Sequence, residues 1–253
     1  MIVRRFGAGP ELVWIHGLGE WSVSFDAIAH HPALDDFAHT LPDLPGYGRS
    51  PPPDPIPARD SLGHLASHLV AWLAGRPPVV LVGHSMGGVL ATLVAEQIAV
   101  RGVIDVDGNL SRGDCTFSVQ AASYSPEDFL AHGFGELRAQ VYTAGIQDPA
   151  LRGYHVALAA ADPAMFHRNS IDLLELSATD TLAERVVNLR APSLFVAGVP
   201  GGICEHSRLM LDRLGARWMV VQPSGHWVHV DQPDELAAAI AGFVRELAAS
   251  HVQ

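Results

Sequence analysis

The chain has 253 residues, of which 48% are hydrophobic and 17% charged, a composition that excludes a disordered chain or a coiled coil and favours one large globular domain. Its 27 acidic side chains outnumber 16 basic ones, and the formal charge of −11 argues against nucleic acid or an anionic membrane surface as a partner. All basic residues are arginine, which excludes a Schiff-base or pyridoxal-phosphate lysine and a phosphate-loop lysine.

Cysteine usage and the first residues bear on the compartment. Cys115 and Cys204 form no C-x-x-C pair and no disulfide framework, which suits a reducing environment. The chain reaches Gly7 too soon for a signal-peptide core, and no apolar run approaches the roughly 20 residues of a membrane span. These features predict a cytoplasmic protein.

Short apolar runs bounded by Gly or Pro alternate with amphipathic stretches, which is typical of a mostly parallel sheet covered by helices on both faces. The predicted strands, in chain order, are 2–6, 12–15, 40–44, 79–82, 103–106, 193–197 and 218–221. The predicted helices of the core are 61–74, 85–100, 205–214 and 233–249.

Residues 110–190 interrupt this alternation, because they contain helical segments and no buried strand. Ser125-Pro126 and Asp148-Pro149 both indicate helix starts, with a capping side chain followed by Pro at the first helical position. Strand-like segments resume at Ser193. The sequence therefore predicts a core formed by residues 1–109 and 191–253, with 110–190 inserted as a helical cap.

The segment Gly83-His84-Ser85-Met86-Gly87 lies between an apolar strand and a helix of small apolar residues. A serine on such a sharp strand-to-helix turn needs Gly on both sides, because side chains there would meet neighbouring backbone. We therefore predict that Ser85 is an exposed nucleophile at the carboxyl end of its strand.

A serine nucleophile needs a base and donors for the oxyanion. Among fourteen histidines, His226 has the best context, because it follows Gly225 on the loop between the last strand and the last helix; His229 is its rival. The predicted oxyanion donors are the backbone N–H groups of Met86, next to the nucleophile, and of Leu18, in His16-Gly17-Leu18-Gly19 after an early strand.

Taken in order, these motifs resemble the α/β-hydrolase family, in particular the cap-bearing group that includes carboxylesterases, the pimeloyl-carrier methyl esterase and cofactor-free haloperoxidases. The segment from Asp43 to Ser50 adds to the resemblance, which spans nearly all of residues 2–248, and is interpreted as a structural turn beside the oxyanion loop. The resemblance implies a three-layer α/β sandwich. With room for one strand before Leu12, we expect seven strands instead of the usual eight.

The triad acid departs from the family pattern. The family usually places it after the strand at 193–197, in a G-x-x-D pattern, where this chain has Gly201. We predict Asp107 instead, because it ends the strand beside the nucleophile strand, as in those haloalkane dehalogenases that place their acid there. Glu205 and Asp105 are the alternatives.

The predicted function is hydrolysis of carboxylic esters by Ser85, His226 and Asp107, with no cofactor or metal. Two alternatives remain: another triad reaction, by a perhydrolase or haloperoxidase, a hydroxynitrile lyase or a carbon–carbon bond hydrolase, and a slow-turnover ligand receptor. The expected partner is a small free ester, because six Arg against ten Asp and Glu in residues 110–190 make the cap a poor dock for an acidic carrier protein. Seven apolar side chains are predicted to shape the substrate pocket: Trp21, Phe129, Phe134, Tyr142, Met165, Phe166 and Trp227.

Overall fold

A seven-stranded sheet with the strand order β1-β3-β2-β4-β5-β6-β7 forms the centre of the computed structural model, which describes residues 1–250. Only β1 runs antiparallel to its neighbour, and the other pairs are parallel, so the predicted seven-stranded, mostly parallel sheet is confirmed. The strands are β1 (Ile2–Gly7), β2 (Glu11–Ile15), β3 (Ala38–Asp43), β4 (Val80–His84), β5 (Gly102–Val106), β6 (Ser193–Gly201) and β7 (Trp218–Gly225).

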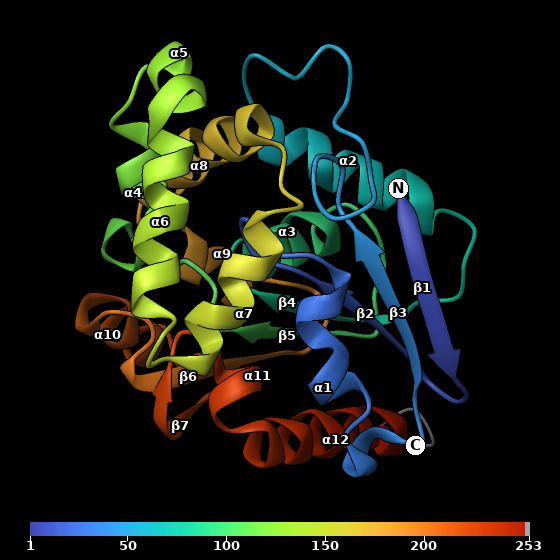
Figure 1. Cartoon of the computed structure of the whole chain (residues 1–253). Coiled ribbons are helices and arrows are strands. Elements are labelled where there is room, and N and C mark those ends of the chain that lie inside the picture. The colour runs from blue at the N-terminus through green and yellow to red at the C-terminus, as the bar shows by residue number, and fades with distance from the viewer. Residues whose placement is uncertain (251–253) are drawn as a thin grey trace.

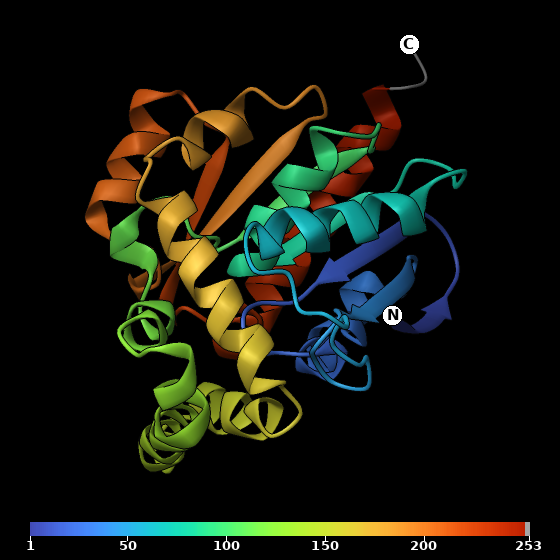
Figure 2. The same cartoon turned by 90° about the horizontal axis from the view of Figure 1, so that it is seen from above.

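Alternating side chains on the strands build one apolar core on each face of the sheet. Val13 and Ile15 of β2 face the side of α2 (Ser61–Leu73), α3 (Met86–Ala95) and α10 (Glu205–Arg213). Leu12 and Trp14 face the opposite side, with α1 (Asp26–Ala29) and α12 (Pro233–Ser250). Figures 1 and 2 show the resulting three layers, the α/β sandwich predicted from the sequence.

The helix after Ser85 is shorter than predicted. It ends at Ala95, whereas the apolar pattern continues to residue 100. The reason is topological: β5 begins at Gly102, and the Arg101 N–H already bonds to the Val79 carbonyl at the start of β4, so the intervening residues must turn back.

Between β5 and β6 the chain is helical, as predicted. The main helices are α4 (Phe117–Ala122), α5 (Pro126–Asp128), the π-helical turn η4 (Phe129–Gly133), α6 (Phe134–Ala144), α7 (Pro149–Leu158), α8 (Pro163–Ser177) and α9 (Leu182–Val187). Ser125 and Asp148 accept hydrogen bonds from the first turns of α5 and α7, as their sequence context predicts. The last helix, α9, packs against α3 and α10 of the core.

No helix in the described part of the chain combines the length and apolar character needed to cross a bilayer.

Asp105 is a buried acid at the centre of the sheet, on β5. It is 1% exposed, and among residues 1–250 its Oδ1 has no hydrogen-bond partner. Burial raises the pKa of Asp105 to about 8, although the Gly108 N–H acts in the opposite direction. The folded protein therefore holds this carboxyl in its neutral form at neutral pH.

An asparagine at position 105 tests this description. The pKa of Asp105 is about 8 in the folded protein and near 3.8 in the unfolded chain. Between these two values Asp105 is ionised in the unfolded chain and neutral in the folded protein, so the wild-type free energy of unfolding falls as the pH rises. Asp105→Asn should therefore raise the free energy of unfolding relative to wild type by up to about 1.4 kcal/mol per pH unit in that window. Urea unfolding at pH 5 and pH 8 measures the difference. The exposed Asp36→Asn serves as control, and a gain that does not change with pH would contradict the prediction.

Candidate active site

Four loops meet at the carboxyl ends of the parallel strands. The loop after β2 contains Leu18, Ser85 follows β4, Asp107 follows β5, and His226 follows β7. Since β2, β4 and β5 are neighbours in the sheet, the first three loops lie side by side. This edge of the sheet is where open α/β folds bind ligands.

Ser85 lies on a turn that its two flanking glycines make possible. Its φ of 55° is in the left-handed region, and its N–H bonds to the Val106 carbonyl at 3.1 Å. A Cβ at Gly83 would lie 2.2 Å from the Gly87 oxygen, and one at Gly87 would lie 1.9 Å from the Ile15 oxygen. The G-x-S-x-G spacing therefore reflects close approach of three backbone segments.

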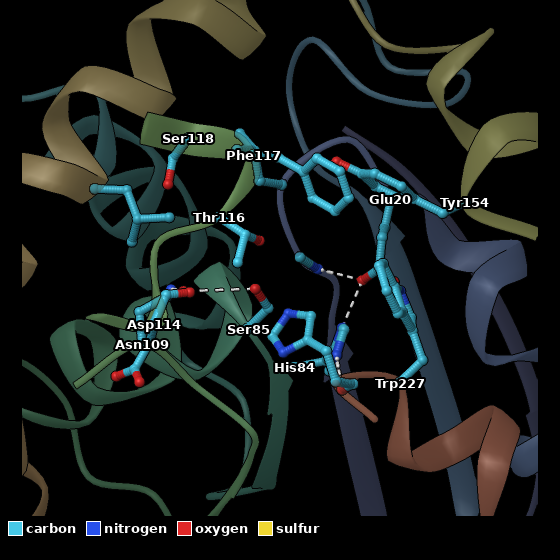
Figure 3. A pocket seen from close by; sticks show the side chains of 14 residues that line it. Glu20, His84, Ser85, Asn109, Asp114, Thr116, Phe117, Ser118, Tyr154 and Trp227 are labelled. Atoms are coloured by element: carbon cyan, nitrogen blue, oxygen red, sulfur yellow. Dashed lines mark hydrogen bonds and ion pairs between the residues drawn. The ribbon is translucent and has the colours of Figure 1, made fainter. Parts of the chain in front are cut away.

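The Ser85 hydroxyl bonds to Asn109, at a distance of 3.4 Å to Oδ1 (Figure 3). The orientation of the Asn109 amide is set by its nitrogen, which donates to the Asp114 carbonyl at 3.0 Å. Ser85 thus has a weak partner in the resting site, from which a small rotation of the hydroxyl can release it.

His226 and Asp107 form a direct pair. The His226 Nδ1 lies 2.6 Å from Asp107 Oδ2, and the carboxylate is fully buried. The other oxygen, Oδ1, accepts the N–H groups of Gly198 at 2.9 Å and Ile203 at 3.2 Å. The carboxylate thus accepts two backbone N–H groups at one oxygen and faces Nδ1 of the ring at the other, so that Nε2 of His226 points away from Asp107.

The alternatives for the acid and the base lie elsewhere. Glu205 is exposed in the first turn of α10, and Asp105 lies deeper in the sheet with the orphaned oxygen described above. His229 is buried with its ring edge against His84, and burial together with the His84 charge lowers the pKa of His229 to about 3. The structure therefore brings together the predicted His226 and Asp107.

The oxyanion loop is held by its own buried polar contacts. Leu18 lines the cavity beside Ser85, and within residues 1–250 neither the Leu18 nor the Met86 backbone N–H has a hydrogen-bond partner. His16 accepts the Leu44 N–H at 3.0 Å, and burial lowers the pKa of this histidine, which is therefore neutral.

The turn from Asp43 to Ser50 supports this loop from behind, in line with its interpretation as structural. The buried Asp43 carboxylate accepts the backbone N–H of Ser22 and both the backbone and side-chain N–H of Arg49. Hydrogen bonds from Ser22 and Arg49 hold the pKa of Asp43 below its usual range, although burial alone would raise it. Asp43 is therefore an ionised anchor of the turn.

A buried acid and histidine, Glu20 and His84, adjoin Ser85 and His226. The His84 Nδ1 lies 2.8 Å from Glu20 Oε2, and both side chains are at most 3% exposed. Burial alone would raise the pKa of Glu20, but the neighbouring His84 holds it well below its usual range. Burial alone would lower the pKa of His84, but Glu20 and the His226 carbonyl raise it. The two groups are therefore both charged.

A cavity of about 30 Å³ lies beside Ser85, enough for about one water molecule. Of the seven predicted pocket residues, only Trp227 lines this cavity. Residues that the sequence analysis did not select supply most of the wall: Glu20, His84, Asn109, Asp114, Thr116, Phe117, Ser118, Tyr154 and Leu173.

The other predicted pocket residues lie elsewhere, which corrects the prediction. Phe129, Phe134 and Phe166 pack on one another inside the cap, with ring centroids 5.6–5.9 Å apart. Met165 is buried beside them, and Tyr142 is 59% exposed on α6. An apolar residue in a helical insertion is expected to be buried, but the sequence does not show whether it faces a cavity or the other cap helices.

Trp21 lines a second cavity, of about 270 Å³, between the cap helix α7 and the core. Glu20, Tyr154 and Trp227 line both cavities and form the partition between them. The outer wall is aliphatic and solvent-exposed, with contributions from Val23, Val156 and Val230. We call this second cavity the valine groove.

Some of the residues that the sequence analysis missed had a local signal and others had none. Asn109 follows the predicted acid by two residues, and Glu20 follows His16 by four, so both could have been found by surveying polar residues on the predicted catalytic loops. Tyr154 has no such signal, because it reaches the cavity from α7, far along the chain from every motif.

The sequence also resembles known proteins. The profile described as "Alpha/beta hydrolase family" matches residues 12–239. A pimeloyl-[acyl-carrier protein] methyl ester esterase of Stenotrophomonas maltophilia is 30% identical, over 98% of this chain and 97% of the relative. The lipase LipV of Mycobacterium tuberculosis is 31% identical, over 94% of this chain and 95% of the relative.

Solved structures resemble the fold. A thermophilic esterase from Thermogutta terrifontis has a TM-score of 0.78 and 21% identity, covering 97% of this chain and 93% of that one. An enol-lactonase from Burkholderia xenovorans has a TM-score of 0.78 and 16% identity, with 96% of each chain covered.

Proposed function

The chain belongs to the alpha/beta hydrolase family, and from this premise we propose that it cleaves carboxylic esters by nucleophilic catalysis with Ser85, His226 and Asp107. The observation that supports this most is the 2.6 Å contact between His226 Nδ1 and the buried Asp107 carboxylate, with Ser85 and His226 lining one cavity. The names of the relatives, an esterase and a lipase, favour the same reaction.

The proposed mechanism assigns one role to each group. Ser85 attacks the ester carbonyl while Nε2 of His226 takes its proton, and Asp107 stabilises the imidazolium through Nδ1. The N–H groups of Leu18 and Met86 bind the oxyanion. His226 then protonates the departing alcohol, and a water molecule activated by the same ring releases the acid from Ser85.

The substrate class follows from the two cavities. The space beside Ser85 holds only a small group, whereas the valine groove is nearly ten times larger and aliphatic. We assign the reacting carbonyl to the first cavity and an apolar chain of the ester to the valine groove, which it reaches when Tyr154 moves away from Trp227.

A free ester fits this arrangement better than a carrier-bound one. The relative's name specifies a carrier-linked ester for that protein. Here, the net charge of −4 over residues 110–190 disfavours docking of an acidic carrier at the cap, so we retain the small free ester as the substrate.

Removal of the Ser85 hydroxyl tests the reaction. Ser85→Ala should lower turnover of p-nitrophenyl acetate by ~10⁴-fold or more without unfolding the protein, because the acyl-enzyme cannot form. A serine-directed organophosphate should add once to wild type, as measured by mass spectrometry, and not to the variant. The exposed Ser123→Ala is the control. A burst without steady turnover in wild type would favour the receptor alternative, and full activity of Ser85→Ala would exclude this nucleophile.

A comparison of amide variants at the two candidate acids tests which of them pairs with His226. Asp107→Asn should lower kcat by ~10³-fold or more, because the His226 tautomer and the imidazolium lose their partner. Glu205→Gln should leave kcat close to wild type, since Glu205 is exposed on α10. Steady-state kinetics and circular dichroism of both variants provide the comparison. The opposite ranking would place the acid on the loop after β6.

A charge in the valine groove tests the substrate assignment. Val156 is 58% exposed on α7 and lines the groove, so Val156→Asp should lower kcat/KM for p-nitrophenyl octanoate by about tenfold, as expected for loss of one aliphatic contact. Its kcat/KM for the acetate should be unchanged. Val119→Asp, an exposed cap position outside the groove, is the matched control. Equal losses for both esters, or for both variants, would contradict this assignment.

A further inference from the structure

The buried pair of Glu20 and His84 lies where three of the four catalytic loops meet. Glu20 belongs to the loop after β2, His84 is the last residue of β4 and directly precedes Ser85, and both contact the loop after β7. Figure 3 shows Glu20 between His84 and a backbone N–H of its own loop. No step of the proposed reaction uses either side chain.

Every hydrogen-bond partner of the Glu20 carboxylate is a donor. Oε2 accepts the Gly17 N–H at 2.7 Å and His84 Nδ1 at 2.8 Å, and Oε1 accepts the indole N–H of Trp227 at 2.8 Å. A neutral amide could not replace this group, because its NH₂ would face one or more of these donors. The site is therefore built for an ionised carboxylate.

Both ring nitrogens of His84 face acceptors. Nδ1 faces the Glu20 carboxylate, and Nε2 lies 2.9 Å from the His226 carbonyl oxygen. An imidazole satisfies two acceptors only when both nitrogens carry a proton, so His84 is an imidazolium.

The double protonation of His84 bears on whether this cluster could bind a metal ion. Ligand atoms of Glu20, His84 and His229 lie within 4.8 Å of one another, a spacing that could hold a cation. An imidazolium cannot be a metal ligand, because neither nitrogen has a free lone pair. The hydrogen bonds therefore favour an ion pair over a metal site.

We infer that the ion pair of Glu20 and His84 positions the catalytic loops: His84 holds the backbone of His226 through its carbonyl oxygen, and Glu20 holds the oxyanion loop at Gly17 together with Trp227. The effect of this positioning on catalysis rests on the proposed function, whereas the charge of His84 does not. Two buried, opposite charges lock this geometry because neither can be released without leaving the other unpaired. Glu20 and His84 are thus positioning residues: within residues 1–250, neither side chain is hydrogen-bonded to the Ser85 hydroxyl or to the His226 ring.

The charge of His84 should depend on pH in a defined direction. Burial alone would lower the pKa of His84, but Glu20 raises it, so the stability contributed by the His84 charge is complete below 6.5 and is lost as the pH rises through the folded value. The contribution of Glu20, whose pKa is lowered, is complete above 4.5 and is lost as the pH falls through its folded value. In Glu20→Gln, only the His226 carbonyl and Asp107 oppose the effect of burial, and the ring should become neutral at a lower pH. The titratable groups around His84 are Glu20, Asp105, Asp107, His16, His226 and His229.

Histidine NMR tests the charge independently of any activity. In a pH titration with nitrogen-15-labelled histidine, the His84 signal, assigned by its absence in His84→Gln, should change from imidazolium to imidazole at a higher pH in wild type than in Glu20→Gln. A His84 that titrates below 6.5 in wild type would overturn the inference. An unchanged midpoint in Glu20→Gln would do the same.

Kinetics test the positioning role. Glu20→Gln and the double variant Glu20→Gln/His84→Gln should lower kcat for p-nitrophenyl acetate by ~10²-fold with KM nearly unchanged, because misplaced groups lose transition-state alignment rather than ground-state binding. The double variant removes both charges, so it remains folded if the single variant does not. Asp172→Asn, which removes a buried carboxylate that binds Ser61 and Arg168 away from the site, should lose stability but keep its kcat.

The outcomes separate this inference from the proposed function. Wild-type kcat in both Glu20 variants would overturn the positioning role, and loss of wild-type activity on chelation would show a metal site instead. If wild type lacks Ser85-dependent turnover, the proposed function fails, while the NMR result still decides whether the ion pair exists.

Discussion

The backbone turn at Ser85 is the constraint on which the rest of the site depends. It brings the start of α3 so close to β2 that only glycine fits at position 87. A Cβ at this position would lie 1.9 Å from the Ile15 oxygen. The same contact fixes the distance between Ser85 and the loop that contains Leu18, because Ile15 ends the strand from which that loop emerges. The strands on the other side of this turn then set the positions of His226 and Asp107.

Local chemistry made most of the fold predictable. Strands buried on both faces are continuous apolar runs, and Ser125 and Asp148 signal helix starts through their own hydrogen bonds, so neither needs distant information. Contacts between distant segments were not predictable in this way. Glu20 and His84 are 64 residues apart, and nothing near either residue indicates the other. The cap phenylalanines were predicted to shape the substrate pocket, but their partners proved to be one another.

Aromatic side chains join the cap to the core beside His226, and an ion pair between Arg185 and Glu96 joins them elsewhere. Tyr154 from α7 packs against Trp227 of the base loop at 5.3 Å between ring centroids, and Phe117 contacts both rings. Glu20 in turn accepts a hydrogen bond from Trp227. Helix α7 is therefore connected to Glu20 through the contact of Tyr154 with Trp227. The phenylalanine cluster packs η4, α6 and α8 against one another, so the interior of the cap is apolar and closely packed.

The N–H groups that bind Asp107 give β6 and the loop after it a role at the site. The pattern of the family places the acid at position 201, but here Gly198 of β6 and Ile203 of the following loop each donate an N–H to Asp107, which follows the neighbouring strand. A Cβ at Gly202 would lie 2.3 Å from Asp107 Oδ1 and 2.4 Å from the Gly198 oxygen, so a larger residue there would displace the carboxylate. This segment therefore acts on Asp107 through its backbone, and its sequence is constrained by the space that it must leave free rather than by a side chain that it supplies.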